Sequence, residues 1–152
     1  MNIGIDAEFK ALIPPLSAEE YEQLEKNIIA DGCRDPLVTW RGTLIDGHNR
    51  YEICEANGIT FKTTEQDFDD REAVKIWIIE NQFGRRNLPN YTRAKLALEL
   101  KPLYAAKAKK NQVRTSENRV CQISDKQEQP VDTKKELAKV AGVSHDTIAK
   151  VE

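Results

Sequence analysis

The turn around Gly47 combines residue types that could bind an anion. Gly47 follows an apolar stretch and precedes His48, Asn49 and Arg50, whose side chains can all donate hydrogen bonds. A glycine between a strand and a helix lets the backbone approach a ligand, and the first amides of a helix attract negative charge. The Arg50 guanidinium could add a forked contact to phosphate oxygens. We therefore predict a phosphate-binding turn; the residues alone leave open a purely structural turn with a surface arginine.

Residues 132–152 show a second pattern with chemical meaning. It resembles the helix-turn-helix of bacterial DNA-binding proteins, with Ala138 small where two helices would cross and Gly142 suited to a left-handed turn. Five apolar residues fit its core positions: Leu137, Ala141, Val143, Ile148 and Val151. The second helix of such a unit enters the major groove. The predicted DNA contacts are Ser144, His145, Asp146, Thr147 and Lys150. A plain helical hairpin is the alternative.

The charge distribution favours contact with a polyanion at one end of the chain. Residues 1–32 carry seven acidic and two basic side chains, a net charge of −5, whereas residues 85–119 carry ten basic and two acidic ones, a net charge of +8. The whole chain has a net charge of −2, which argues against a protein that coats nucleic acid with its entire surface. A solvated, charged helix is the alternative interpretation of the basic stretch.

Composition and cysteine spacing narrow the class of protein. The 152 residues include 39% hydrophobic and 32% charged side chains, the balance of an ordinary globular chain. The three cysteines form no CxxC pair and are distant from both histidines in sequence, which argues against a disulfide framework or a zinc site. Because the sequence shows neither a signal peptide nor an apolar run of membrane-spanning length, we expect a cytoplasmic protein without a membrane partner.

Apolar periodicity predicts the elements that would position these groups. A capping box formed by Ser17 and Glu20 should begin the first helix, and Arg41-Gly42 should form the tight turn of a hairpin. The predicted strands are 36–40, 43–46 and 61–66, and the predicted helices are 17–31, 48–57, 69–82 and 90–110.

The last two of these helices carry specific expectations. Asp69 should cap the helix 69–82, and Pro102 should kink the helix 90–110 because it removes an amide from the helix interior. The apolar stripe of the helix 90–110 comprises Leu96, Leu100, Leu103 and Tyr104. Residues 111–131 show no periodicity and should form a flexible linker.

The segment 13–86 resembles the ParB/sulfiredoxin superfamily. Asp35-Pro36-Leu37-Val38 resembles the Gln-Pro-Ile-Val strand of that superfamily. Gly47-His48-Asn49-Arg50-Tyr51 resembles its Gly-Glu-Arg-Arg-Trp box. Glu80-Asn81-Gln82, followed by Arg85-Arg86-Asn87-Leu88, is similar to its Glu-Asn-Leu-Gln-Arg box. The resemblance implies an α+β fold with a ParB/Srx-like domain at 1–88 that has a small mixed sheet and packed helices. A helical arm at 89–110, the linker at 111–131 and a helix-turn-helix at 132–152 would follow. Because the chain stops at Glu152, that last unit is expected to be truncated.

The resemblance also implies a ligand. In ParB proteins the two boxes hold the triphosphate of CTP with Mg2+, and nucleotide binding closes a clamp on DNA. The implied ligand here is CTP, or another nucleoside triphosphate, with Mg2+. The residues implied in nucleotide or phosphate binding are Gly47, His48, Asn49, Arg50, Glu80, Asn81, Arg85 and Arg86. Glu80 is also the candidate metal ligand. The implied partners are double-stranded DNA, the nucleotide, a second copy of the chain and a partner ATPase.

Three departures separate this chain from chromosomal ParB. Pro14-Pro15-Leu16 replaces a Gln-Pro-Arg segment, Asp35 stands where glutamine is preferred, and Arg50 is single where the family has an arginine pair. One forked cation fewer would weaken phosphate binding by a few kcal/mol, judging by hydrogen bonds between charged groups. The Gly-His-Asn-Arg version is more similar to phage and mobile-element members. Sulfiredoxin activity is not expected, because a histidine occupies the position of the reactive cysteine.

These observations support three hypotheses. The first is a DNA-binding protein of plasmid, phage or mobile-element type that acts in partition or transcription and associates with a bacterial nucleoid or plasmid. The second is a ParB-fold enzyme, a nuclease, NTPase or phosphotransferase, with Glu80, His48 and Asp46 as catalytic candidates. The third is an adaptor that dimerises through the apolar stripe 96–104, although such stripes are more often intrachain core.

Overall fold

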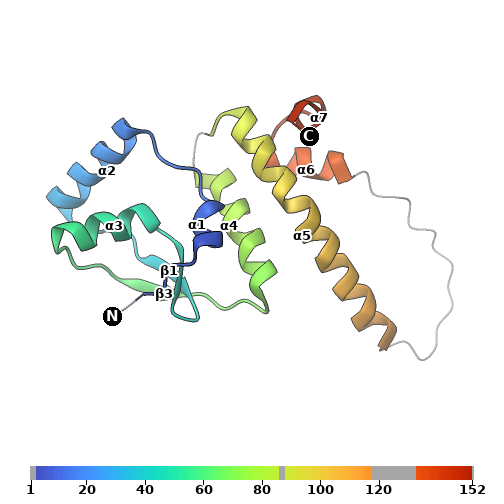
Figure 1. Cartoon of the computed structure of the whole chain (residues 1–152), viewed down its shortest axis with the longest axis horizontal. Helices are drawn as coiled ribbons and strands as arrows, with labels where there is room; N and C mark the ends of the chain where they lie inside the picture. Colours follow the sequence, from blue (N-terminus) through green and yellow to red (C-terminus); the bar gives the residue numbers. More distant parts are fainter. Residues whose placement is uncertain (1–2, 86–87, 118–132, 152) are drawn as a thin grey trace. The chain divides into compact units, whose positions relative to one another are not determined.

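A computed structural model of the chain describes residues 3–85, 88–117 and 133–151. It divides into two compact units, Met1–Ile78 and Ile79–Glu152, and helix α4 (Arg71–Arg85) crosses the division (Figure 1). The fold is α+β, with a three-stranded mixed sheet in the first unit and helices in both. None of the described helices is long and apolar enough to cross a membrane.

The first unit is built around the small sheet. Its elements before α4 are α1 (Ala7–Ala11), α2 (Ala18–Asp31), β1 (Leu37–Trp40), β2 (Thr43–Asp46), α3 (His48–Asn57) and β3 (Thr63–Glu65). The strand order is β2-β1-β3; β1 pairs antiparallel with β2 and parallel with β3. The helix α3 connects β2 to β3. The chain leaves the sheet at Asp46, passes through Gly47 and enters α3 at His48.

The hairpin turn has the predicted residues and the expected backbone. Arg41 has a φ of 49° and Gly42 a φ of 74°, so both central residues are left-handed, as a two-residue hairpin requires. The backbone amide of Arg41 donates to the Glu65 carboxylate, and the Thr39 hydroxyl donates to the same side chain at 2.6 Å. Glu65 of β3 therefore fixes the end of β1 and the turn together.

Local capping confirms one predicted helix start and corrects another. Ser17 and Glu20 form the predicted capping box of α2, with bonds of 3.2 and 2.8 Å. The predicted cap Asp69 is wrong: α4 begins at Arg71, and Asp70 accepts a bond from the amide of Ala73 at 2.9 Å. The helix α1 was not predicted, although the side chain of its N-cap, Asp6, accepts from two amides of the first turn.

Three apolar clusters form the core of the first unit. The clusters are Phe9, Trp40, Ile45, Val74 and Ile78; Ile3, Leu37 and Leu44; and Ile28, Ile53 and Cys54. The cluster around Phe9 packs α1 and α4 against the sheet. The cluster around Leu37 joins β1 to β2, and the cluster around Ile53 joins α2 to α3. Figure 1 shows α2 and α3 side by side. The turn at Gly47 is therefore attached to a packed strand on one side and a packed helix on the other.

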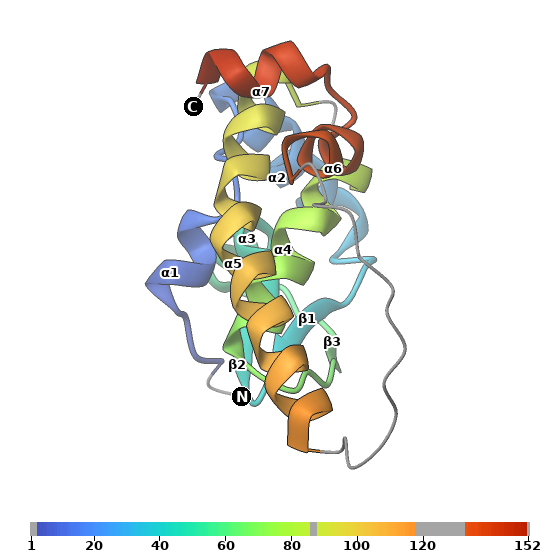
Figure 2. The same ribbon diagram turned by 90° about the vertical axis from the view of Figure 1, so that its right-hand side faces the viewer.

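The second unit consists of the end of α4 with α5 (Asn90–Glu117), α6 (Thr133–Ala141) and α7 (His145–Val151). The helix α5 runs through Pro102 and ends at Glu117, so the first seven residues of the predicted linker are helical rather than flexible. Residues 118–131 lie outside the described residues. Both views show α6 and α7 beside the N-terminal half of α5 (Figures 1 and 2).

Small and branched apolar residues hold α6 and α7 against α5. The buried residues are Ala94, Leu96, Ala97 and Leu100 of α5, Leu137, Ala138 and Ala141 of α6, and Ile148 of α7. Alanines at the contact let helix axes approach closely, while the leucines and the isoleucine fill the space between them. Of the five residues predicted to be apolar core in this segment, Leu137, Ala141 and Ile148 are buried. The other two, Val143 and Val151, are half-buried.

Candidate functional site

The strand-to-helix turn has the geometry predicted at Gly47. Gly47 has a φ of 95° and a ψ of 24°, and α3 begins at the next residue. The carbonyl of Gly47 accepts a hydrogen bond from the amide of Tyr51 at 2.9 Å. No described side chain caps this helix end. The first amides of α3 are therefore arranged as at other helix N-termini that attract anions.

The structure gives a different reason for the glycine from the one predicted. A Cβ at Gly47 would lie 2.7 Å from Leu37 Cδ2 and 3.0 Å from Arg50 Nη2. The close approach that the glycine permits is thus to the chain's own side chains. Leu37 is fully buried, so it has no open space into which to rotate.

Arg50 is bound within the protein. Its Nη1 donates to the carbonyls of Asp35 and Pro36 at 2.9 and 3.3 Å, and its Nη2 lies 3.1 Å from the Asp46 carboxylate. The side chains of this ion pair are 17% and 12% exposed. The predicted forked phosphate contact would have to use the remaining donors or break these bonds. Because Asp46 is the last residue of β2 and Arg50 lies in α3, the i,i+4 rule for helices does not apply to this pair, and no local sequence pattern indicated it.

His48 lies inside the first unit rather than on its surface. Its residue exposure is 4%, and neither ring nitrogen has a hydrogen-bond partner among the described residues. Burial lowers the pKa of His48, and the positive charge of Lys10 lowers it further, against the opposing effect of Asp46 and Glu52. The ring is therefore neutral at physiological pH. Asn49, the next residue, is half-buried.

The buried histidine should make stability depend on pH. The unfolded chain titrates near the ordinary histidine pKa of 6.5, whereas the pKa of the folded chain is lower, so between the two values the unfolded state binds more protons. The free energy of unfolding should fall as pH decreases through that window, by up to about 1.4 kcal/mol per pH unit. Urea denaturation at pH 7.5 and 5.5 would measure this.

The chain supplies its own control for that measurement. His145, the other histidine, has a side chain that is 46% exposed. We expect His48→Gln to flatten the dependence between these two pH values and His145→Gln to leave it unchanged. An equal slope in the wild type and His48→Gln would contradict the assignment of the dependence to burial of this ring.

The residues of the second predicted box belong to the second unit. Glu80 is exposed and accepts from the hydroxyl of Tyr104 at 2.6 Å; burial and this bond raise the pKa of Tyr104. Asn81 Nδ2 is buried without a partner among the described residues. Arg85 is the last residue of α4, and Arg86 lies outside the described residues. A joint site with the turn at Gly47 stays a prediction.

Neither a metal site nor a reactive thiolate is found among the described side chains. No group of three or more His, Cys, Asp or Glu residues within 3–85, 88–117 and 133–151 could hold a metal ion. The pKa of the Cys54 thiol is raised to about 11, because the side chain is buried and hydrogen-bonds to Cys33. Cys54 therefore belongs to the core, as predicted. Asp46, the third catalytic candidate, is bound to Arg50.

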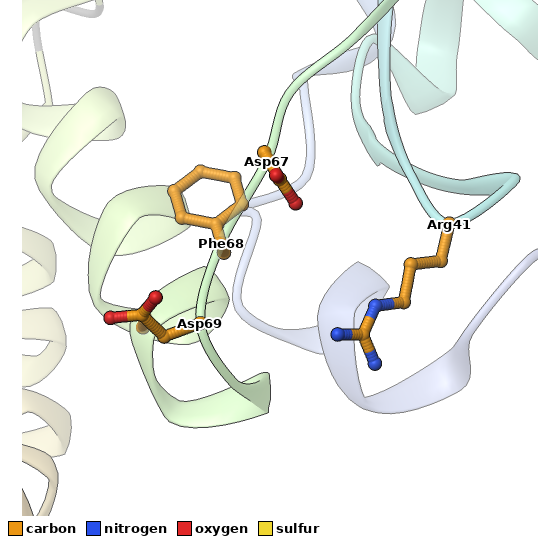
Figure 3. A pocket seen from close by; sticks show the side chains of 5 residues that line it. Arg41, Asp67, Phe68 and Asp69 are labelled. Atoms are coloured by element: carbon orange, nitrogen blue, oxygen red, sulfur yellow. The ribbon is translucent and has the colours of Figure 1, made fainter.

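A cavity of about 490 Å³ lies elsewhere in the first unit. It is lined by Arg41, Asp67, Phe68, Asp69 and Ala73, and Figure 3 shows the Arg41 guanidinium on one side with the two carboxylates on the other. Arg41 also stacks over the ring of Trp40 at 4.8 Å. In this view the Asp69 carboxylate points away from Arg41, and none of the predicted site residues lines this space.

Four of the predicted DNA-contacting residues gather at the start of α7, and the fifth, Lys150, lies in its last turn. Ser144, His145, Asp146 and Lys150 are exposed and Thr147 is half-buried, while Ile148 on the same helix is fully buried. Ser144 caps the helix: its Oγ accepts from the amide of Thr147 at 3.2 Å and lies 2.8 Å from the Thr147 hydroxyl. The helix therefore buries one face and presents the polar candidates on the other.

Arg93 is a residue of the second unit that sequence reasoning missed. Its Nε donates to the carbonyl of Ala141 at 2.6 Å, and its guanidinium lies over the ring of Phe83 at 5.5 Å. In the sequence, Arg93 is one of ten basic residues between 85 and 119, so no signal separated it from its neighbours.

Comparisons with known proteins identify the fold. No family model and no curated protein matches the sequence. Among solved structures, the C2221 form of a Pnob8-like ParB-N domain matches with a TM-score of 0.69 and 23% identity over 99% of this chain and 66% of that one. A pNOB8-like ParB N-domain matches with a TM-score of 0.62 and 24% identity over 98% and 59% of the two chains. The chain thus has the fold of ParB N-domains and spans about two thirds of their length or less.

Proposed function

We propose that this chain is a ParB-like DNA-binding protein that reads duplex DNA with α7 and contacts the phosphate backbone with α5. It would act in plasmid, phage or mobile-element partition or in transcription. The observation that carries the proposal is the α6–α7 pair, whose buried residues pack on α5 while the polar residues of α7 stay exposed. A helix held in this way can enter the major groove with its first turns near base edges.

The basic residues of α5 and the fold support the same proposal. Lys95, Lys107 and Lys109 are exposed on α5 and can meet phosphates without sequence preference. The matched structures are themselves named ParB N-domains. A second copy of the chain and a partner ATPase are part of the proposal by that likeness alone.

Salt dependence of DNA binding tests the proposal. The wild-type chain should bind a pool of mixed-sequence duplexes, with the logarithm of the binding constant falling linearly as the logarithm of salt concentration rises. Lys150→Gln should weaken binding and lower the magnitude of that slope by about one, because one phosphate contact is lost. Fluorescence anisotropy over a salt series would measure both quantities.

The control is a lysine outside the proposed interface. Lys26→Gln removes the same charge from an exposed position of α2 in the first unit, where Lys26 pairs only with Glu22 four residues away among the contacts described. Its slope should equal that of the wild type. Binding that is absent, or insensitive to salt, would overturn the proposal.

A nucleotide site at the Gly47 turn is the second part of the proposal. The uncapped N-terminus of α3 could receive phosphates of CTP or another nucleoside triphosphate, accompanied by Mg2+. Since Asp46 already neutralises Arg50, attraction of an anion would rest on the main-chain amides of α3 more than on the guanidinium. Calorimetric titration with CTP, ATP and GTP, each with and without Mg2+, would decide whether the turn binds a nucleotide and which base it prefers.

A further inference from the structure

The turn between α6 and α7 is closed mainly by its own backbone. The amide of Val143 donates to the carbonyl of Ala138 at 3.0 Å, and the amide of Gly142 donates to the carbonyl of Lys139 at 3.2 Å. These two bonds, with Gly142 at a φ of 63°, form a Schellman motif. The motif satisfies two of the carbonyls at the end of α6, and the carbonyl of Ala141 is among those that have no partner within the helix.

Arg93 of α5 supplies a donor for the Ala141 carbonyl. Its Nε lies 2.6 Å from the Ala141 oxygen, a short, charge-assisted bond at the negative end of the α6 dipole. The guanidinium also contacts Phe83, whose ring centroid is 5.5 Å away and whose carbonyl is 3.5 Å from Nη1. Arg93 is half-buried in this position. A side chain held by these contacts is poorly placed to reach out to a phosphate.

Gly142, the residue after Ala141, also lies next to the Arg93 guanidinium. A Cβ added there would lie 3.1 Å from Arg93 Nη2, closer than ordinary van der Waals contact. The glycine thus serves the left-handed backbone and also leaves room for the guanidinium. Since Ser144 caps α7 only two residues later, the position of this turn sets the direction in which α7 leaves it.

We infer that Arg93 is a positioning residue for DNA binding, which holds the α6–α7 turn so that α7 is presented correctly, without itself touching DNA. This inference rests on the proposed function, since it assigns a role within the same DNA-reading unit. It separates Arg93 from the exposed lysines of α5, which would contact phosphates directly.

The salt slope distinguishes positioning from contact. Arg93→Gln should weaken binding to the mixed-sequence duplexes by about tenfold while leaving the slope of log binding constant against log salt equal to that of the wild type. A phosphate-contacting arginine would instead lower the magnitude of the slope by about one. Lys95→Gln, which removes the same charge from an exposed position of α5 that would contact phosphate, should lower the magnitude of the slope by about one. Unchanged affinity, or a reduced slope, for Arg93→Gln would overturn the inference.

Two measurements keep the test decisive if a variant is unstable or DNA binding fails. In Arg93→Gln, hydrogen exchange should quicken at the amides of 142–147 and stay unchanged in 37–46 of the first unit. The unfolding-midpoint shift caused by Gly142→Ala should be smaller in the Arg93→Gln background than in the wild type, because the clash partner is gone. Additive shifts would show that the guanidinium does not occupy this place. A wild-type chain that does not bind DNA would reject the proposed function, while these two results would still decide whether Arg93 holds the turn.

Discussion

Gly47→Ala should destabilise the first unit by about 3 kcal/mol, the largest effect expected from removing any glycine of the fold. Two costs add at this position. An alanine at a φ of 95° is strained, and its Cβ would lie 2.7 Å from a methyl group of Leu37. Leu37 is fully buried on the central strand of the sheet, so moving it disturbs its packing with Ile3 and Leu44. Chemical denaturation followed by tryptophan fluorescence would measure the loss, since Trp40 and Trp77 both belong to this unit.

Gly58→Ala is the matched control for the contribution of packing. Gly58 ends the same helix that Gly47 begins, it is also left-handed with a φ of 64°, and a Cβ there would meet no atom within 4 Å. It should cost only the backbone strain, about 1 kcal/mol. The difference between the two variants contains the contact with Leu37 and Arg50, together with the additional backbone strain at a φ of 95°. Equal losses would show that Leu37 moves aside freely, and the turn would then have room for a ligand above Gly47.

The elements that the sequence predicted best are those whose ends carry their own chemistry. The capping box of Ser17 and the left-handed pair Arg41-Gly42 determine local structure through bonds within a few residues. The α6–α7 pair was predicted because residues 132–152 resemble a helix-turn-helix, in which Ala138 and Gly142 stand where the two helices meet. Long-range packing then confirmed the pattern rather than creating it.

The errors fall where local signals compete or are missing. Asp69 and Asp70 are equally good caps by residue type, and only the tertiary position of α4 selects Asp70. The end of α5 was placed too early because polar residues after Lys110 weaken the periodicity without preventing a helix. The role of Arg93 depends on a carbonyl 48 residues away, and no local pattern records such a contact.

The same limit explains why the turn at Gly47 was only half predictable. Sequence reasoning placed Gly47 at a strand-to-helix turn and put helix amides after it, and both predictions are confirmed. It also assigned Arg50 to phosphate, whereas the structure uses the guanidinium to satisfy two carbonyls and the Asp46 carboxylate. A residue type suited to a ligand is equally suited to an internal partner, so burial decides between them.

Arg50→Gln should destabilise the first unit by about 2–3 kcal/mol, because it removes a guanidinium from beside a carboxylate that is 12% exposed and removes the donor of two carbonyls. Arg50→Lys should recover only part of the loss, since one ammonium cannot reproduce the planar fork. In a double-mutant cycle, Asp46→Asn with Arg50→Gln should cost less than the sum of the single changes. Additive losses would contradict a structural ion pair.

The ion pair also gives a test of the proposed anion site in which anion affinity should rise while stability falls. Asp46→Asn removes the negative charge 3.1 Å from the guanidinium and so leaves Arg50 with an uncompensated positive charge. If phosphates bind at the uncapped end of α3, this variant should bind inorganic pyrophosphate more tightly than the wild type, by about tenfold, even though it is less stable. Asp35→Asn removes the same charge from a residue whose carbonyl, not its carboxylate, contacts Arg50, and it should change the affinity less. Weaker or unchanged binding by Asp46→Asn would mean that Arg50 serves the fold alone and that phosphates do not bind at this turn.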